Sequence, residues 1–342
     1  MPGFIRRLFT RHAGANTAAS VRNVPPLPDN DEWFYPDSGL PYPRWKKIGN
    51  WVAENVEAED FDEAYNIAVR LWLRRMAAAG GGGMRSAESP NFILLSPFEQ
   101  TGRRWALKAL ENARRSIFEA LGTLAWAQGW GKHLVLAMHP ALYARYTAHY
   151  FSGDYMARSA GLMISGGGYT HIAAQASLTA REDSAFLRTL AHELTHNALC
   201  QLPLPRWLDE ALAMSFEDQL GGGEPSIADR LGASFEAVGT RGLLRNFADW
   251  WTEEKMQGFW GGALWNSAED EQSHCYEMAR IIFRIIRQSV DGAPGRFRAF
   301  VGDADAMDGG QVAAKEHLGL SLGEVAADFL GEGDWEPQPV LW

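Results

Sequence analysis

The sequence predicts an α+β fold in which a small mixed sheet packs beside a mainly helical lobe. Short apolar runs typical of strands end near residue 174, and from residue 181 onward apolar residues recur almost everywhere at helical spacing. The chain has 342 residues, of which 46% are hydrophobic and 22% charged, as in an ordinary globular protein. The chain can therefore bury a sizeable core without relying on disulfides or metal ions.

The N-terminal part of the chain divides into two segments. Residues 1–60 are rich in Pro and Trp and show little periodicity, so they are expected to form an extended N-terminal arm. Residues 61–79 have apolar residues at helical spacing and contain no helix breaker, and Gly80 to Gly83 follow as a flexible break. Residues 61–83 are therefore predicted to be a helix and a Gly-rich linker.

The remainder is predicted to form two subdomains. Residues 84–180 form an α/β subdomain with an edge strand, and residues 181–342 form a helical subdomain. Strands are expected at 92–95, 133–138, 161–168 and 169–174, with one long helix at 101–128. The later helices are expected at 183–200, 206–219, 227–237, 271–290, 294–302 and 321–330.

Charge and cysteine content exclude several classes of protein. The net charge is −10 and no stripe of Lys and Arg is visible, which argues against nucleic acid as a partner. Only two cysteines occur, Cys200 and Cys275, which fits a reducing cytoplasm. Because no stretch approaches 18 apolar residues, no membrane span is expected and the predicted location is cytoplasmic.

The segment His192-Glu-Leu-Thr-His196 has the spacing of a metal site. Residues four apart share a helix face, so both imidazoles can reach one ion. Glu193 is offset by about 100° on a helix and can act on a water molecule held by that ion. Five-residue matches do arise by chance, but the flanking FLRTLA and NALC are apolar and compatible with a buried helix.

A third ligand is expected from the next helix. A catalytic zinc ion takes three protein ligands and keeps one open position. The prolines in Leu202-Pro-Leu-Pro205 allow a tight return, after which a helix beginning near Arg206 can present Glu210 to the metal. Asp209 is the alternative ligand, although at a helix start it more naturally caps the helix or supports a ligand.

Here the sequence resembles the gluzincin metallopeptidases, and among them the peptidase MA-like domains. The resemblance rests on HELTH followed by PRWLDEALA, and it extends more loosely over residues 92–335. It implies a zincin-like metallopeptidase fold, Zn²⁺ bound by His192, His196 and Glu210, and a peptide or protein substrate.

Two positions depart from that family. Ala211 replaces a usual Gly, and Met214 lies where related enzymes often have a carboxylate that supports a ligand. Ligand histidines usually donate their other N–H to an oxygen. The expected acceptors are Asp209, Glu217, Asp218 or a backbone carbonyl, with Asp209 and Glu217 preferred.

The resemblance also suggests residues for the oxyanion and the substrate. A Tyr or His from a later helix supports the oxyanion in similar enzymes, which points to Tyr276 or His274, with Tyr276 preferred. Such enzymes bind the peptide backbone along an edge strand before the metal helix. The candidate strand is 169–177, with Tyr169, Ile172 and Ala174 contacting substrate, whereas His171 is expected to be a surface residue.

These residues predict metal-assisted hydrolysis of peptide bonds. Zinc would acidify a bound water and polarise the scissile carbonyl, and Glu193 would act as general base. A metal-binding but non-catalytic binding or structural module is the alternative, suggested by Met214 and the long arm. A third hypothesis is a peptidase inhibited by its own arm, residues 1–60.

Overall fold

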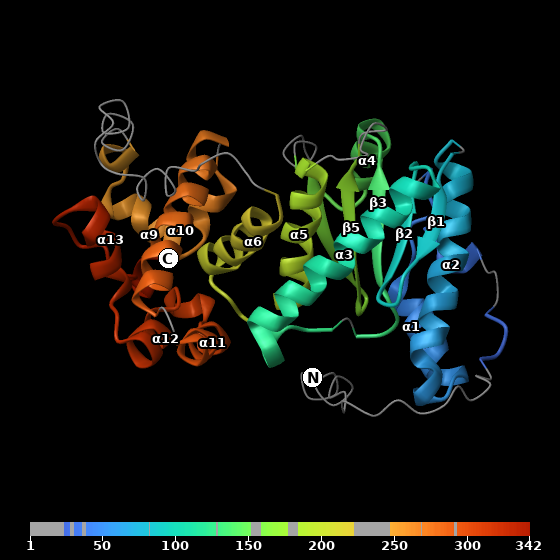
Figure 1. Ribbon diagram of the computed structural model, residues 1–342, viewed down its shortest axis with the longest axis horizontal. Coiled ribbons are helices and arrows are strands. Elements are labelled where there is room, and N and C mark those ends of the chain that lie inside the picture. The colour runs from blue at the N-terminus through green and yellow to red at the C-terminus, as the bar shows by residue number, and fades with distance from the viewer. Residues whose placement is uncertain are drawn as a thin grey trace. The chain divides into compact units, whose positions relative to one another are not determined.

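The structure is a computed structural model that describes most of the chain, namely residues 24–27, 31–35, 39–81, 83–127, 129–151, 159–176, 184–221, 247–267, 269–290 and 293–342. It divides into two compact units (Figure 1). The sheet unit comprises residues 1–111 and 127–186, and the helical unit comprises residues 112–126 and 187–342. The predicted helix 227–237 lies outside the described residues.

The sheet unit is built on one five-stranded mixed sheet of order β1-β2-β3-β5-β4. β2, β3 and β5 are parallel, whereas β1 and β4 run antiparallel to their neighbours. Every residue of β2 and β3 is buried, as expected for central strands covered on both faces. The bounds are β1 (Arg85–Glu88), β2 (Phe92–Ser96), β3 (His133–Met138), β4 (Gly161–Gly166) and β5 (Tyr169–Gln175). The prediction of a mixed α/β architecture is confirmed.

The strand order corrects the expected edge strand. β5 pairs with β3 on one side and with β4 on the other, so its backbone groups are already used within the sheet. Tyr169, Ile172 and Ala174 are each at most 1% exposed. An extended peptide therefore cannot add to β5, and β4 occupies the edge instead. Strand spacing along a chain does not reveal pairing order, which is why the sequence misplaced the edge.

One face of the sheet carries a core rich in aromatic residues. Helices α1 (Trp45–Asn55), α2 (Phe61–Ala79) and α4 (Pro140–Thr147) contribute to this core, together with alternate residues of β2 and β3. Trp72 is fully buried there, and Trp45 stacks on Tyr169 with ring centroids 4.1 Å apart. Large rings supply much of the apolar area that stabilises this unit.

This core changes the interpretation of the N-terminal segment. Residues 45–55 are helical, not extended, and Trp33, Phe34 and Ile48 are buried in the core. Gly80 ends α2 and Gly81 turns the chain at a positive φ of 90°, but both sides of this turn belong to the sheet unit. The described part of residues 1–60 therefore contributes to the core of the sheet unit, and deleting it would remove core side chains.

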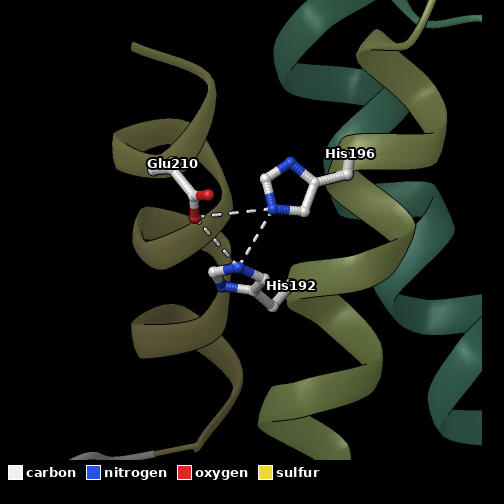
Figure 2. Close-up of side chains that lie close together, drawn as sticks. All are labelled: His192, His196 and Glu210. Carbon is white, nitrogen blue, oxygen red and sulfur yellow. Dashed lines mark hydrogen bonds and ion pairs between the residues drawn. The ribbon is translucent and has the colours of Figure 1, made fainter. Parts of the chain in front are cut away.

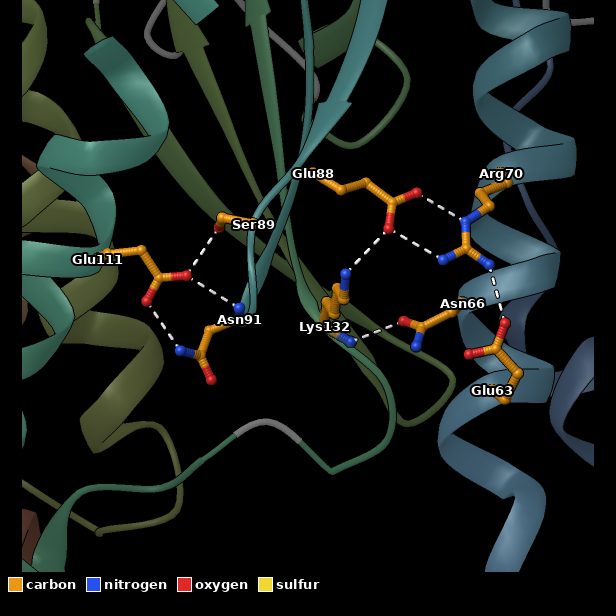
Figure 3. A network of polar contacts seen from close by, with 8 residues as sticks. All are labelled: Glu63, Asn66, Arg70, Glu88, Ser89, Asn91, Glu111 and Lys132. Atoms are coloured by element: carbon orange, nitrogen blue, oxygen red, sulfur yellow. Dashed lines mark hydrogen bonds and ion pairs between the residues drawn. The ribbon is translucent and has the colours of Figure 1, made fainter. Parts of the chain in front are cut away.

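Charged residues at the rim of the sheet unit pair with fixed partners (Figure 3). Arg70 on α2 donates to both carboxylate oxygens of Glu88 at 2.7 and 2.9 Å, and Lys132 donates to the same carboxylate at 2.9 Å. Glu111 on α3 (Gln100–Leu121) accepts hydrogen bonds from the turn between β1 and β2. Permanent cations or backbone N–H groups thus compensate these carboxylates.

The helical unit is formed by α10, which packs against α6 and α13, and by shorter helices around them. Trp207, Trp260, Trp265 and Phe300 are each at most 1% exposed in its interior. The helices are α5 (Ser184–Leu199), α6 (Arg206–Gly221), α9 (Glu253–Trp260), α10 (Glu269–Ser289), α11 (Pro294–Asp303), α12 (Gln311–Ala313) and α13 (Leu322–Leu330). None of the helices described combines the length and apolar composition that a membrane crossing requires.

Candidate metal centre

Two successive helices of the helical unit carry the predicted metal ligands. α5 ends at Leu199, where the Leu202 N–H donates to the Leu199 carbonyl at 2.9 Å and closes the turn. Pro203 and Pro205 prevent the helix from continuing. α6 begins directly afterwards, with the Leu208 and Asp209 N–H groups donating to the Pro205 carbonyl.

Trp207 anchors the first turn of α6. Its Nε1–H donates to the Gly309 carbonyl at 2.9 Å, and its ring meets Trp260 edge-on at 5.6 Å. Trp207 is fully buried, so these contacts fix the rotation of the helix about its axis. Glu210, one turn further on, is thereby directed at α5.

The three predicted ligand atoms converge on one point (Figure 2). The Nε2 atoms of His192 and His196 lie 3.0 Å apart. Oε2 of Glu210 lies 3.4 Å from His192 Nε2 and 3.6 Å from His196 Nε2. Atoms bound at ~2.0–2.1 Å to a tetrahedral zinc ion lie about 3.3–3.4 Å apart, so the spacing suits a single ion. This cluster could hold a metal ion.

The outer nitrogens of both imidazoles face carboxylates. His192 Nδ1 lies 3.1 Å from Glu217 Oε2, and His196 Nδ1 lies 2.9 Å from Asp209 Oδ2. A carboxylate can only accept, so each Nδ1 carries the proton. In a neutral imidazole this leaves Nε2 with a lone pair that points at the other ligands. Of the acceptors considered from sequence, Asp209 and Glu217 take this place, while Asp218 pairs with Arg280.

A cation between them would stabilise three electron-pair donors at such short range. If both rings are neutral, the lone pairs of two nitrogens and one carboxylate oxygen repel each other at distances of 3.0–3.6 Å. Glu210 Oε2 is moreover buried and has no hydrogen-bond donor, which is costly for a charged oxygen. A proton on one ring relieves part of this conflict, but a divalent ion satisfies all three atoms. The donor set therefore fits a metal ion.

The carboxylates around His192 and His196 give the site a strongly anionic environment. Burial by itself would lower the pKa of His192, but the carboxylates of Glu210 and Glu217 outweigh it and raise that pKa to about 9. Burial likewise opposes the charge on His196, yet Asp209 and Glu210 raise its pKa well above the ordinary value. Burial would raise the pKa of Glu210, but the two histidines lower it. Without a metal ion, the carboxylates thus favour a positive charge on the imidazole rings at neutral pH.

Glu193 lies on α5 beside the ligands. It is only 8% exposed, which is unusual for a glutamate. Its carboxylate is near enough to His192 to contribute, after Glu210 and Glu217, to the raised pKa of that histidine. Its placement is compatible with a role beside the metal and not as a ligand.

Arg206 is a participant that the sequence did not single out. Its Nε lies 3.5 Å from Glu210 Oε1, the oxygen that does not face the histidines. The guanidinium therefore helps to hold the carboxylate with Oε2 turned to the ligand cluster. The i, i+4 spacing of Arg206 and Glu210 on one helix was the signal that could have identified it.

The structure gives the two oxyanion candidates different surroundings. His274 on α10 stacks on Trp250 with centroids 4.0 Å apart, and its Nδ1 lies 2.7 Å from the Asp270 carbonyl. Tyr276 meets Trp265 edge-on at 5.2 Å. Their catalytic roles stay predictions. Met214 is buried, and the carboxylate expected near its position is supplied three residues later by Glu217.

Comparison with known proteins gives no family for this chain. Neither the protein-family models nor the curated protein sequences match it. The geometry of the site is therefore the basis for the function proposed below.

Proposed function

We propose that the chain is a zinc-dependent hydrolase, and specifically a peptidase of the gluzincin type with a zincin-like fold. The observation that carries this proposal is the convergence of His192 Nε2, His196 Nε2 and Glu210 Oε2, with distances of 3.0–3.6 Å between them. Two imidazoles and one carboxylate are a donor set that catalytic zinc sites use, with a fourth position left open. When bound, the ion would acidify an attacking water and polarise the scissile carbonyl.

The residues around the ligands have distinct roles in this proposal. Asp209 and Glu217 accept the Nδ1 protons of the two histidines, which fixes each ring so that Nε2 points inward. Arg206 orients the Glu210 carboxylate. These contacts mean that the ligand geometry does not depend on the ion alone.

Glu193 is the proposed general base. It takes a proton from the attacking water and delivers it to the leaving amine. Glu193 is only 8% exposed. Bulk water is therefore largely excluded from its carboxylate, which favours direct proton transfer over a short distance. Tyr276, or His274, is the proposed donor to the developing oxyanion.

The decisive variant is Glu193→Gln, because it keeps the shape of the side chain but cannot accept the proton. We expect unchanged zinc content by elemental analysis and a loss of peptide-library cleavage of about 10²–10⁴-fold. Glu316→Gln, an exposed glutamate of the same unit, is the matched control and should keep both properties. Undiminished cleavage by Glu193→Gln would contradict the assignment.

The alternative, a metal-binding module without catalysis, has less support than the sequence suggested. It was motivated by Met214 and by the arm, but Glu217 accepts from His192 and the described part of the arm belongs to the sheet unit core. Stoichiometric zinc without cleavage of any peptide in a broad library would favour the module. Absence of zinc binding would exclude both functions.

A further inference from the structure

The sheet unit contains a second pocket that the proposed hydrolase chemistry does not use. It has a volume of about 650 Å³, within the range of small-molecule sites. Its walls are the start of α1, the residues that follow α4, and the hairpin between β4 and β5. We call it the α1 pocket.

One wall of the α1 pocket is strongly basic. Arg44, Lys46 and Lys47 line it, and no Asp or Glu is among its described lining residues. None of these three cations has an acidic partner within the described parts of the chain. In a chain of net charge −10, three cations without an acidic partner among the described residues reverse the sign of the charge around this cavity. Such a wall favours an anionic ligand.

The start of α1 adds to this preference. The helix has 11 residues, no side chain caps its N-terminus, and no acidic residue lies in its first turn. The partial positive charge of a helix N-terminus attracts anions. Gly167 of the hairpin lies against this end, because a Cβ there would come within 2.9 Å of Trp45 Cβ and still nearer to Lys46 N. The hairpin and the helix start therefore form one fixed corner of the pocket.

Three side chains that line the pocket have buried polar atoms without a hydrogen-bond partner among the described residues. His171 is 2% exposed, and its Nε2 lies 2.7 Å from the Tyr146 hydroxyl, but its Nδ1 has no partner. Trp45 is 5% exposed, and its Nε1–H has no acceptor. Arg44 Nε is similarly buried without a partner. Unpaired buried polar atoms are rare and usually indicate a missing ligand or water.

The opposite wall is aromatic. Tyr35, His149 and Tyr150 line the pocket, with the Tyr35 and His149 rings 5.2 Å apart. His149 stacks on Tyr42 at 3.8 Å, which holds it in place. Arg44 lies over the Tyr35 ring at 4.8 Å, so the cationic and aromatic walls meet. Flat rings are bound well by such a surface through stacking.

We propose that the α1 pocket binds a small anion that carries a flat ring, with the anionic group at Arg44, Lys46 and Lys47 and the ring against Tyr35 and His149. Nucleotides and aromatic carboxylates share this chemistry.

The test is calorimetric titration of the full chain with two probes, AMP and indole-3-acetate, each compared with its uncharged counterpart, adenosine or indole. We expect at least one anion to bind at least about tenfold more tightly than its uncharged counterpart, because two or three ion pairs are lost without the charge. AMP binding alone would identify a nucleotide site, and indole-3-acetate binding alone a carboxylate site. Binding of neither anion, or equal binding of charged and uncharged forms, overturns the proposal.

Variants locate the binding. The double variant Lys46→Gln/Lys47→Gln should lower the affinity for the anion by about tenfold. Arg104→Gln/Lys108→Gln removes the same charge from exposed positions on α3 and should change binding less than about twofold. Gly166→Leu should block the pocket without unfolding, because a Cβ there meets no atom within 4 Å. Equal loss in the two charge variants, or full binding by Gly166→Leu with a wild-type circular dichroism spectrum, would place the ligand elsewhere.

Discussion

The two units bury histidines in opposite ways. In the sheet unit, His171 has a neutral partner, the Tyr146 hydroxyl, and meets Trp72 edge-on at 5.4 Å. Burial lowers its pKa to about 3, so the ring is uncharged at neutral pH. In the helical unit, four carboxylates surround or adjoin His192 and His196, and the pKa of His192 rises to about 9 despite burial.

The surroundings distinguish a structural histidine from one that is suited to bind a metal ion. A single buried imidazole with a hydroxyl partner and no carboxylate partner stays neutral. Two imidazoles whose Nδ1 atoms face carboxylates, and whose Nε2 atoms meet a third carboxylate, have an excess of negative charge and of lone pairs. A metal ion at the centre would compensate that excess.

The largest effect should come from removing a ligand. His196→Gln should reduce zinc content from about one equivalent to nearly none, because two remaining ligands hold zinc poorly. His171→Gln is the matched control, since it changes another buried histidine. It should keep zinc and instead lose about 1–3 kcal/mol of stability, because the Tyr146 hydroxyl loses its 2.7 Å hydrogen bond and keeps only the longer one to the Tyr150 hydroxyl. Elemental analysis and denaturation measure the two properties, and the contrast fails if both variants lose zinc equally.

Removing a carboxylate behind a ligand should have a smaller effect. Asp209→Asn and Glu217→Gln should each weaken zinc binding by about 10–100-fold, because each histidine loses the acceptor that fixes its ring. Competition with a chromogenic chelator measures the affinity. Glu316→Gln, which removes an exposed carboxylate of the same unit, should leave it unchanged. Unaltered affinity in both Asp209 and Glu217 variants would show that the ligand orientation is set by packing alone.

The pH dependence should separate the two kinds of histidine. Because the pKa of His171 falls from 6.5 to about 3 on folding, the unfolded chain binds a proton that the folded chain excludes between these values. His171 therefore removes up to about 1.4 kcal/mol of stability for each pH unit below 6.5. Hydrogen exchange in β3 and β5 should show wild type losing protection on acidification more steeply than His171→Gln. Parallel pH profiles would contradict a neutral buried His171.

The smallest effect on stability should come from Glu88, whose carboxylate is paired with Arg70 and Lys132. The hydrogen bonds from Arg70, opposed by partial burial and supported by Lys132, lower the pKa of Glu88 to about 2. Its stabilising contribution is present above about pH 4.5 and is lost as the pH falls towards 2. Since Arg70 is 37% exposed, Glu88→Gln should cost only about 0.5–1 kcal/mol at neutral pH and leave zinc binding intact. A change in zinc content would show that acidic residues of the sheet unit also affect the metal.

The sequence predicted the local features and missed those set by distant contacts. Residues 61–79 agree with α2 because their apolar residues recur at helical spacing. Residues 133–138 agree with β3 because they form a short apolar run that is typical of a buried strand. The spacing of His192, His196 and Glu210 sufficed to bring them together, since a helix and a Pro-rich turn leave little choice. α1 was not predicted, because the prolines before it suggested an extended segment, although Trp45, Ile48 and Val52 recur at helical spacing.

Other errors have the same origin. His171 was expected at the surface, but β5 lies inside the sheet and the residue is 2% exposed. The helix expected over 101–128 ends at Leu121, where Gly122 adopts a positive φ of 61°. The sequence also did not pair each histidine with its carboxylate. Glu217 faces His192 and Asp209 faces His196, and this pairing depends on side-chain packing between α5 and α6, which sequence spacing does not specify.

The most direct measurement is a crystal structure of the zinc-soaked protein with anomalous data on both sides of the zinc edge. The account predicts one strong peak about 2.0–2.2 Å from His192 Nε2, His196 Nε2 and a Glu210 oxygen, with a coordination position open to solvent. No peak at these atoms in a fully soaked crystal, or a Glu210 carboxylate turned away from the two histidines, would contradict it.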